Sequence, residues 1–190
     1  MFTCLPIIRG EIIRSETLTN VRRITAFVRA RQIDAMSDCC QSSSDTPAPS
    51  VMSCPLDGTR SKPVDMVTVK SIVRNLPLGM PNTQYYFCNA QECDVVYFGF
   101  DAAAPRFGRK DLLVRVGAKE KSDPIPICYC FGFARHDIWE EAQRTGSSAI
   151  SEKVRAEIKA GRCACEVKNP SGKCCLGEVQ RVFAGAMRTR

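Results

Sequence analysis

Six of the twelve cysteines in this chain form one closely spaced C-terminal pattern. Two Cys-x-Cys pairs lie thirty-two residues apart and an adjacent pair follows them, giving Cys128, Cys130, Cys163, Cys165, Cys174 and Cys175. Thiolates are the preferred ligands of soft metals and of iron–sulfur clusters. Zinc sites usually use Cys-x₂₋₄-Cys turns, so the Cys-x-Cys spacing favours a [2Fe–2S] cluster. Structural zinc thiolates and unligated buried cysteines are the alternatives.

The cluster requires four thiolates that converge from separate turns. The first Cys-x-Cys turn can supply two of them, and a helical hairpin after it would return the chain to the same place. There Cys163 and one cysteine of the adjacent pair would complete the set. Two substitutions stay open, Cys165 for Cys163 and Cys174 for Cys175.

A second group of cysteines has the form of a zinc ribbon. The segments Cys54-Pro-Leu-Asp57-Gly58 and Cys88-Asn-Ala-Gln-Glu-Cys93 are two turns, each able to deliver two ligands. Asp57 stands where such a turn usually has a second cysteine. Because carboxylate oxygen is an accepted zinc ligand, we predict a structural zinc held by Cys54, Asp57, Cys88 and Cys93. The alternative is that Asp57 only makes the turn's side-chain-to-backbone hydrogen bond.

These residues need elements to position them, and the pattern predicts an α+β protein. Short β-branched and aromatic runs predict a small antiparallel sheet over 65–74, 85–88, 95–98 and 112–116. After Cys130, apolar residues at helical spacing predict a helix ending at Gly146 and a second ending at Gly161, with Ser147 or Ser148 as its cap. A third helix is predicted over 176–184. The expected fold is a zinc-ribbon-like antiparallel sheet followed by a helical [2Fe–2S]-binding domain.

Composition predicts three parts. Residues 1–53 combine an arginine-rich stretch with a Ser/Pro-rich linker, so we expect a disordered or poorly ordered N-terminal extension there. Met36 is a candidate start of translation within it. The zinc-ribbon-like domain is expected over 54–121 and the cluster-binding domain over 122–187.

Charge and missing motifs exclude several function classes. The net charge is +7, but the charges are interspersed, so no nucleic-acid partner is expected. No run of eighteen apolar residues and no secretory signal is present, so we expect a cytoplasmic protein without a membrane partner, in which clustered cysteines bind metal. A single histidine and the lack of a glycine-rich phosphate loop argue against an enzyme, beyond metal-ion reduction by the cluster.

The cysteine strings carry a family resemblance. The cluster pattern resembles the bacterioferritin-associated ferredoxin type of [2Fe–2S] domain, and the strings at 123–132 and 163–177 resemble more closely the N-terminal domain of CopZ-type copper chaperones, over about residues 53–184. The resemblance implies cluster ligands Cys128, Cys130, Cys163 and Cys175, and one-electron transfer linked to copper. Partners would be an electron donor or acceptor protein, or a metal carrier.

The chain departs from that family pattern in one respect. It has no Cys-x-x-Cys and therefore no chaperone-type copper-binding motif. A redox- or iron-sensing interaction module and a structural double-zinc protein are the rival interpretations.

Overall fold

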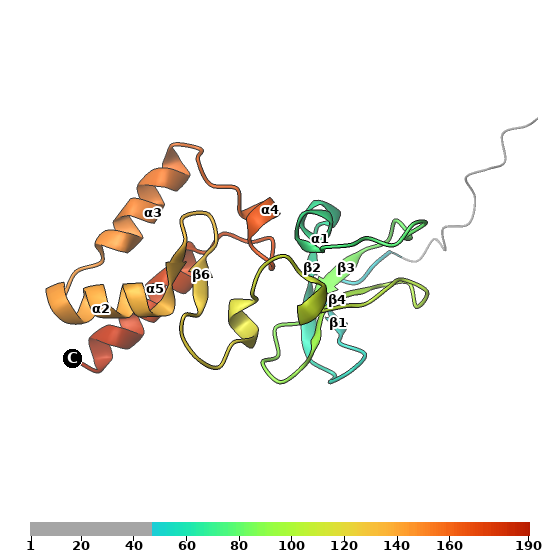
Figure 1. Cartoon of the computed structure of the whole chain (residues 1–190), viewed down its shortest axis with the longest axis horizontal. Coiled ribbons are helices and arrows are strands. Elements are labelled where there is room, and N and C mark those ends of the chain that lie inside the picture. The colour runs from blue at the N-terminus through green and yellow to red at the C-terminus, as the bar shows by residue number, and fades with distance from the viewer. Residues whose placement is uncertain (1–46) are drawn as a thin grey trace, which may run out of the picture. The chain divides into compact units, whose positions relative to one another are not determined.

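The computed structural model describes residues 47–190 (Figure 1). Expectations for residues 1–46, including the candidate start at Met36, lie outside the described residues. The strands are β1 (Met52–Ser53), β2 (Arg60–Val64), β3 (Tyr85–Phe87), β4 (Val95–Gly99), β5 (Phe107–Gly108), β6 (Pro126–Cys128) and β7 (Phe133–Ala134). The helices are α1 (Met66–Ile72), α2 (Arg135–Thr145), α3 (Ala149–Lys159), α4 (Cys165–Lys168) and α5 (Leu176–Arg188), with short 3₁₀ turns η1 (Arg109–Asp111) and η2 (Gly117–Lys119).

The first five strands form one antiparallel sheet in the order β1-β2-β3-β4-β5. Strands β1 and β2 are neighbours joined by residues 54–59, and β3 and β4 are neighbours joined by residues 88–94. Because direction alternates along an antiparallel sheet, these two connections lie at the same end of it. The topology therefore brings together the two turns that carry the predicted zinc ligands. The α+β class is confirmed.

The run at 65–74 is a helix, and its prediction as a strand is wrong. The buried residues Thr68, Val69 and Ile72 recur at helical spacing, while Val67, directly before them, is exposed. A short β-branched run cannot be assigned by periodicity alone, and here burial against the sheet decides for the helix.

The run at 112–116 is also not a strand. Leu112 makes one isolated antiparallel bridge with Val73, and the chain then enters the 3₁₀ turn η2. Its buried side chains, Leu112 and Val116, are four residues apart, and Leu113 is exposed. The predicted runs at 85–88 and 95–98 do form strands, β3 and β4.

The three predicted helices of the second half are present as α2, α3 and α5. Gly146 follows α2 with a φ of 68°, a left-handed conformation that favours glycine and ends the helix. Ser148 is the N-cap of α3, although its side chain makes no capping hydrogen bond. Helix α5 runs four residues beyond the predicted end at residue 184, to Arg188.

No helix in residues 47–190 has the length and apolar character that crossing a bilayer would require.

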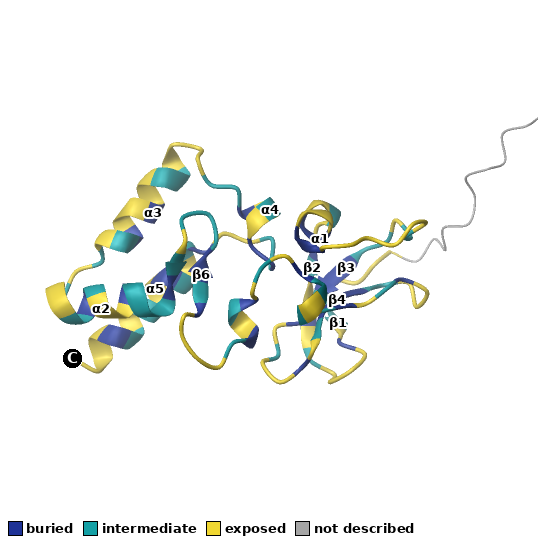
Figure 2. Cartoon of the chain, in the orientation of Figure 1, coloured by how far each residue is buried: buried dark blue, intermediate teal, exposed yellow. Residues whose placement is uncertain are grey.

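The buried side chains form separate clusters (Figure 2). One lies between the sheet and α1, and another packs β6 against α2, α3 and α5 and includes Cys128 and Cys175. The two are tied together by hydrogen bonds: Thr68 Oγ1 donates to the carbonyl of Glu166 at 2.6 Å, and Tyr97 donates to the carbonyl of Pro170 at 2.6 Å. Helix α4 is thus fixed to α1, and the loop after it is fixed to the sheet.

Candidate metal centres

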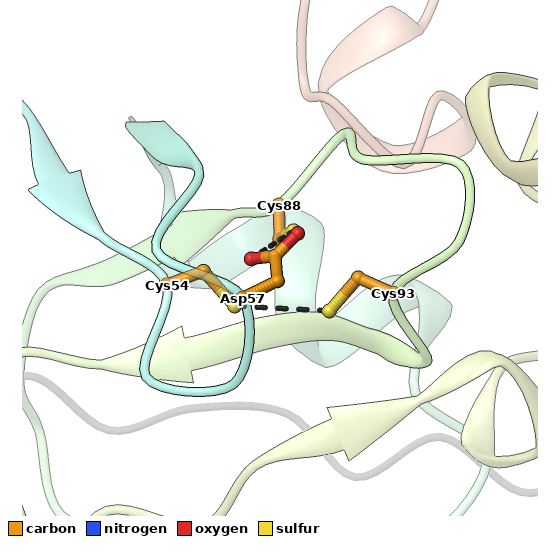
Figure 3. Close-up of side chains that lie close together, drawn as sticks. All are labelled: Cys54, Asp57, Cys88 and Cys93. Carbon is orange, nitrogen blue, oxygen red and sulfur yellow. Dashed lines mark hydrogen bonds between the residues drawn. The ribbon is translucent and has the colours of Figure 1, made fainter.

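The first predicted zinc turn is built by local hydrogen bonds. The amide of Gly58 donates to the carbonyl of Cys54 at 2.9 Å, and the amide of Cys54 donates to the carbonyl of Thr59 at 2.8 Å. Gly58 has a φ of 74°, so the turn needs a residue without a Cβ at this position. This geometry places the side chains of Cys54 and Asp57 on the same side of the turn (Figure 3).

The second turn faces the first. Cys88 follows β3, and its amide donates to the carbonyl of Val96, while the amide of Cys93 donates to the carbonyl of Ala90. The ligand atoms of Cys54, Asp57, Cys88 and Cys93 all lie within 4.8 Å of one another, as Figure 3 shows. The three cysteines are buried and Asp57 is exposed.

The distances in this group fit a tetrahedral zinc ion. Two sulfurs, each about 2.3 Å from zinc, stand about 3.8 Å apart in a tetrahedron. The Sγ atoms of Cys54 and Cys93 are 3.8 Å apart, and the Cys88 thiol donates to Asp57 Oδ1 at 3.9 Å. These four donors match the ligand types and spacing that zinc requires.

Asp57 also makes the hydrogen bond that the alternative interpretation assigned to it. Its Oδ1 accepts from the amide of Thr59 at 3.1 Å, and its Oδ2 accepts from the hydroxyl of Thr59 at 2.7 Å. The hydroxyl bond is the main reason why the pKa of Asp57 is lowered. The turn bond and the position beside Cys88 are therefore compatible, because a carboxylate has more than one acceptor site on each oxygen.

Burial works against the thiolate state of the group when no metal is bound. Desolvation raises the pKa of Cys54 to about 12 and also raises the pKa of Cys88. A zinc ion would reverse this effect, since coordination deprotonates a thiol.

A buried lysine touches this site, and sequence reasoning did not single it out. The ammonium of Lys119 contacts Cys88 Sγ at 3.8 Å, and the side chain is fully buried. In the sequence it stands in the polar string Gly117-Ala-Lys-Glu-Lys121, which is typical of a solvated loop. Only the fold shows that the chain turns this residue inward.

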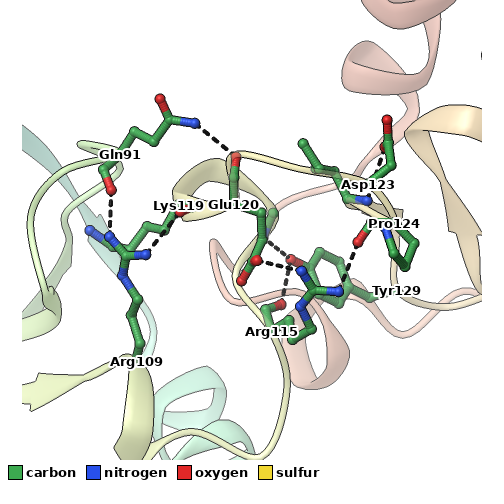
Figure 4. Close-up of polar contacts among 10 residues, drawn as sticks. Gln91, Arg109, Arg115, Lys119, Glu120, Asp123, Pro124 and Tyr129 are labelled. Carbon is green, nitrogen blue, oxygen red and sulfur yellow. Dashed lines mark hydrogen bonds and ion pairs between the residues drawn. The ribbon is translucent and has the colours of Figure 1, made fainter.

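A polar network continues from Lys119 toward the second half of the chain (Figure 4). Arg109 donates to the carbonyls of Lys119 and Gln91, and Gln91 donates to the carbonyl of Glu120. Beyond it, Arg115 pairs with Glu120 and donates to the carbonyl of Pro124 at 3.0 Å.

Tyr129, the central residue of the first Cys-x-Cys pair, ends this network. Its hydroxyl donates to the carbonyl of Arg115 at 3.0 Å and accepts from the amide of Gly117 at 2.8 Å. The turn that carries Cys128 and Cys130 is thereby held against the segment that carries Lys119.

The second group of cysteines forms two close thiol pairs. The Sγ atoms of Cys130 and Cys165 are 3.6 Å apart, and Cys128 and Cys175 lie in one buried cluster, close enough for each thiol to shift the pKa of the other. The amide of Ala164 also donates to Cys130 Sγ at 3.3 Å. Three separate segments, at β6, α4 and the start of α5, deliver these four side chains.

The remaining two predicted candidates differ from these four in position. Cys163 is half-buried and Cys174 is exposed, and within residues 47–190 neither makes a thiol–thiol hydrogen bond. Cys174 and Cys175 both line a hollow of about 680 Å³, together with Lys62 and Lys173.

The thiol pairs differ in their tendency to ionise. The hydrogen bond from Cys175, with the backbone amides of Phe131 and Cys130, lowers the pKa of Cys128 to about 6. The same bond and burial raise the pKa of Cys175, and burial raises that of Cys165 to about 12. The Cys175 thiol, and to a smaller extent the backbone donors, therefore favour the thiolate of Cys128.

Comparison with known proteins agrees with the first site. A family described as a zinc binding domain, zf_CopZ, matches residues 51–112, a range that contains all four predicted zinc ligands. The copper chaperone CopZ of Archaeoglobus fulgidus is 33% identical over 133 residues, which are 70% of this chain and 62% of that protein. The chain thus spans somewhat less than two thirds of that relative's length.

A solved structure extends the likeness to the fold. The X-ray structure of the Archaeoglobus fulgidus CopZ N-terminal domain superimposes with a TM-score of 0.52 at 33% identity, covering 69% of this chain and 97% of that domain. The matched share of the chain is larger than residues 1–112, so the match includes at least part of the chain after residue 112. The chain belongs to the CopZ family, by its similarity to nearly the whole of the CopZ N-terminal domain.

Proposed function

We propose that this chain is a metal-handling protein that combines a structural zinc with a redox-active [2Fe–2S] cluster. Zinc would be held by Cys54, Asp57, Cys88 and Cys93. The cluster would be held by Cys128, Cys130, Cys165 and Cys175, and when bound it supplies one-electron redox chemistry.

The observation that carries the proposal is the convergence of two thiol pairs from three segments of the second half. Cys130 lies beside Cys165, and Cys128 lies beside Cys175. Two irons separate their four ligands more widely than a single ion does. In the described part of the chain, only the zinc group brings three or more ligand atoms within 4.8 Å of one another.

Contacts favour Cys165 over the sequence-based choice of Cys163. Cys165 is buried and faces Cys130, whereas Cys163 is half-buried. Helix α4 begins at Cys165, and Cys163 precedes its N-cap residue, Ala164. Cys175 likewise is buried among apolar side chains, and Cys174 is exposed.

The proposed role is electron delivery in copper or other metal-ion handling. The relative named above is a copper chaperone. Cys128, Cys130, Cys165 and Cys175 would hold the cluster, and its one-electron chemistry would let the protein accept an electron from a donor protein and reduce Cu(II) to Cu(I) for a metal carrier. The hollow beside Cys174 and Cys175 gives such partners an approach to one edge of the thiol group.

The test is the ultraviolet–visible spectrum and metal content of the full chain purified without oxygen. We expect a red-brown protein with about two irons and about one zinc per chain, whose visible bands dithionite bleaches. A colourless protein with two zinc ions that resists cluster reconstitution would contradict the redox role and support a structural double-zinc protein.

A further inference from the structure

The side chain of Lys119 is fully buried, which is rare for lysine. Its ammonium has three hydrogen-bond donors, and all three have acceptors: Cys88 Sγ at 3.8 Å, the carbonyl of Ala90 at 2.9 Å and the carbonyl of Cys93 at 2.9 Å. A neutral amine has only two donors and a lone pair, so this set of acceptors fits the charged form.

No carboxylate in residues 47–190 lies within ion-pair distance of this ammonium. A buried charge without a counter-charge is strongly destabilising. The nearest groups that can become anionic are the zinc ligands themselves. Three thiolates and one carboxylate around a divalent ion leave two negative charges uncompensated. The positive charge of Lys119 and the negative charge of the zinc site therefore stabilise each other.

We propose that Lys119 is the positioning counter-charge of the zinc site, and that it raises zinc affinity by stabilising the anionic set of three thiolates and one carboxylate. This inference rests on the zinc part of the proposed function. The backbone of Lys119 is held by contacts that need no metal. Its amide donates to the carbonyl of Val116, and its carbonyl accepts from Arg109 (Figure 4).

Contacts that orient metal ligands typically change metal affinity by about 10–100-fold when they are removed. Lys119→Met keeps most of the length of the side chain and removes the charge and its donors. The matched control is Lys121→Met, since Lys121 is exposed and pairs with exposed Glu92.

The experiment measures zinc affinity by competition with a chromophoric chelator, on full-length wild type and both variants, with urea unfolding of the zinc-free proteins. Lys119→Met should bind zinc about 10–100-fold more weakly, while its zinc-free form loses less stability than this, since removing a buried charge offsets the loss of the donors to the carbonyls of Ala90 and Cys93. Lys121→Met should match wild type in both.

Several outcomes would overturn the inference. Equal zinc affinity in Lys119→Met and wild type is one, and a loss of zinc-free stability as large as the loss of affinity is another, because it would indicate a purely structural lysine. If wild type itself binds no zinc, the zinc part of the proposed function fails instead.

A second measurement covers the case in which Lys119→Met does not fold. In wild type with ¹⁵N-labelled lysine, the zinc-loaded protein should show one side-chain ammonium signal that exchanges slowly with water. If every lysine ammonium of the zinc-loaded protein exchanges rapidly, Lys119 is not the counter-charge of the site.

Discussion

The hydroxyl of Tyr97 donates a 2.6 Å hydrogen bond to the carbonyl of Pro170, a residue 73 positions later in the chain. Both residues are buried, and burial raises the pKa of the Tyr97 phenol, so it stays a donor throughout the physiological range. The bond fastens the loop between α4 and Cys174 to strand β4. The proposed cluster ligands are thus positioned partly by the sheet that carries the zinc site.

Tyr97→Phe should lower the free energy of unfolding by about 1–3 kcal/mol, because it leaves the buried carbonyl of Pro170 without a donor. Urea unfolding of the zinc-loaded protein measures the change. Tyr86→Phe is the control, since Tyr86 donates to the carbonyl of exposed Pro49, which water can satisfy. An equal loss of unfolding free energy in the two variants would show that the bond to Pro170 contributes no more to stability than the bond to Pro49.

Cys165→Ser should lose most of the iron and the visible bands after anaerobic reconstitution, because it removes the thiol beside Cys130. The control is Cys163→Ser, two residues earlier in the sequence, which should keep both the iron and the visible bands. Iron content per chain and the spectrum are the measurements. The reverse result would restore Cys163 to the ligand set.

Gly117→Ala should destabilise the protein by about 1–3 kcal/mol and reduce its iron content, since a Cβ at this position would lie 2.1 Å from the carbonyl oxygen of Pro126. That contact would push η2 away from β6, which ends at Cys128. Thermal unfolding and iron analysis report the two effects.

The control for this substitution is Gly177→Ala. Gly177 lies in helix α5 and has nothing within 4 Å of its Cβ position, so alanine there should be neutral or stabilising by about 0.5–1 kcal/mol. If both glycine variants lose stability equally, the close approach of Gly117 to Pro126 is not the cause.

Acid should weaken the ion pair between Asp123 and Arg135. The guanidinium of Arg135 donates to Asp123 at 2.7 Å and lowers the pKa of that carboxyl below 3.8. Because the folded-state pKa is the lower one, the contribution to stability is complete above the carboxyl's ordinary pKa and disappears as the pH falls through the folded-state value.

The measurement for this pair is the stability difference between wild type and Asp123→Asn as a function of pH. It should be small, because both side chains are partly exposed, and constant near neutrality. It should shrink below about pH 4. A difference that grows in acid would contradict this sign.

Local patterns in the sequence were enough for the helices of the second half and for β3 and β4. They failed at 65–74, where β-branched residues form α1 because Val69 and Ile72 are buried against the sheet. They failed again at 112–116, where Leu112 and Val116 are buried without strand pairing. In both places tertiary burial overrode local propensity.

For the candidate sites, spacing was sufficient to select four residues that the fold brings together, Cys54, Asp57, Cys88 and Cys93, because two hairpins bring their turns to one end of the sheet. Spacing could not decide between Cys163 and Cys165, since their side-chain directions depend on where α4 begins. Lys119 was not predictable at all. Nothing in a polar string distinguishes a lysine that the fold turns inward from one that stays in water.

The two hairpins also bear on the order in which the protein assembles. All four proposed zinc ligands lie between residues 54 and 93, and Cys54 and Cys93 are only 39 positions apart. The loops of the second half depend on much longer separations, such as the 98 positions between Thr68 and Glu166. Since short-range contacts form first, a chain emerging from the ribosome can complete its zinc turns before the last cysteines are synthesised. Zinc loading would then precede cluster insertion in the cell.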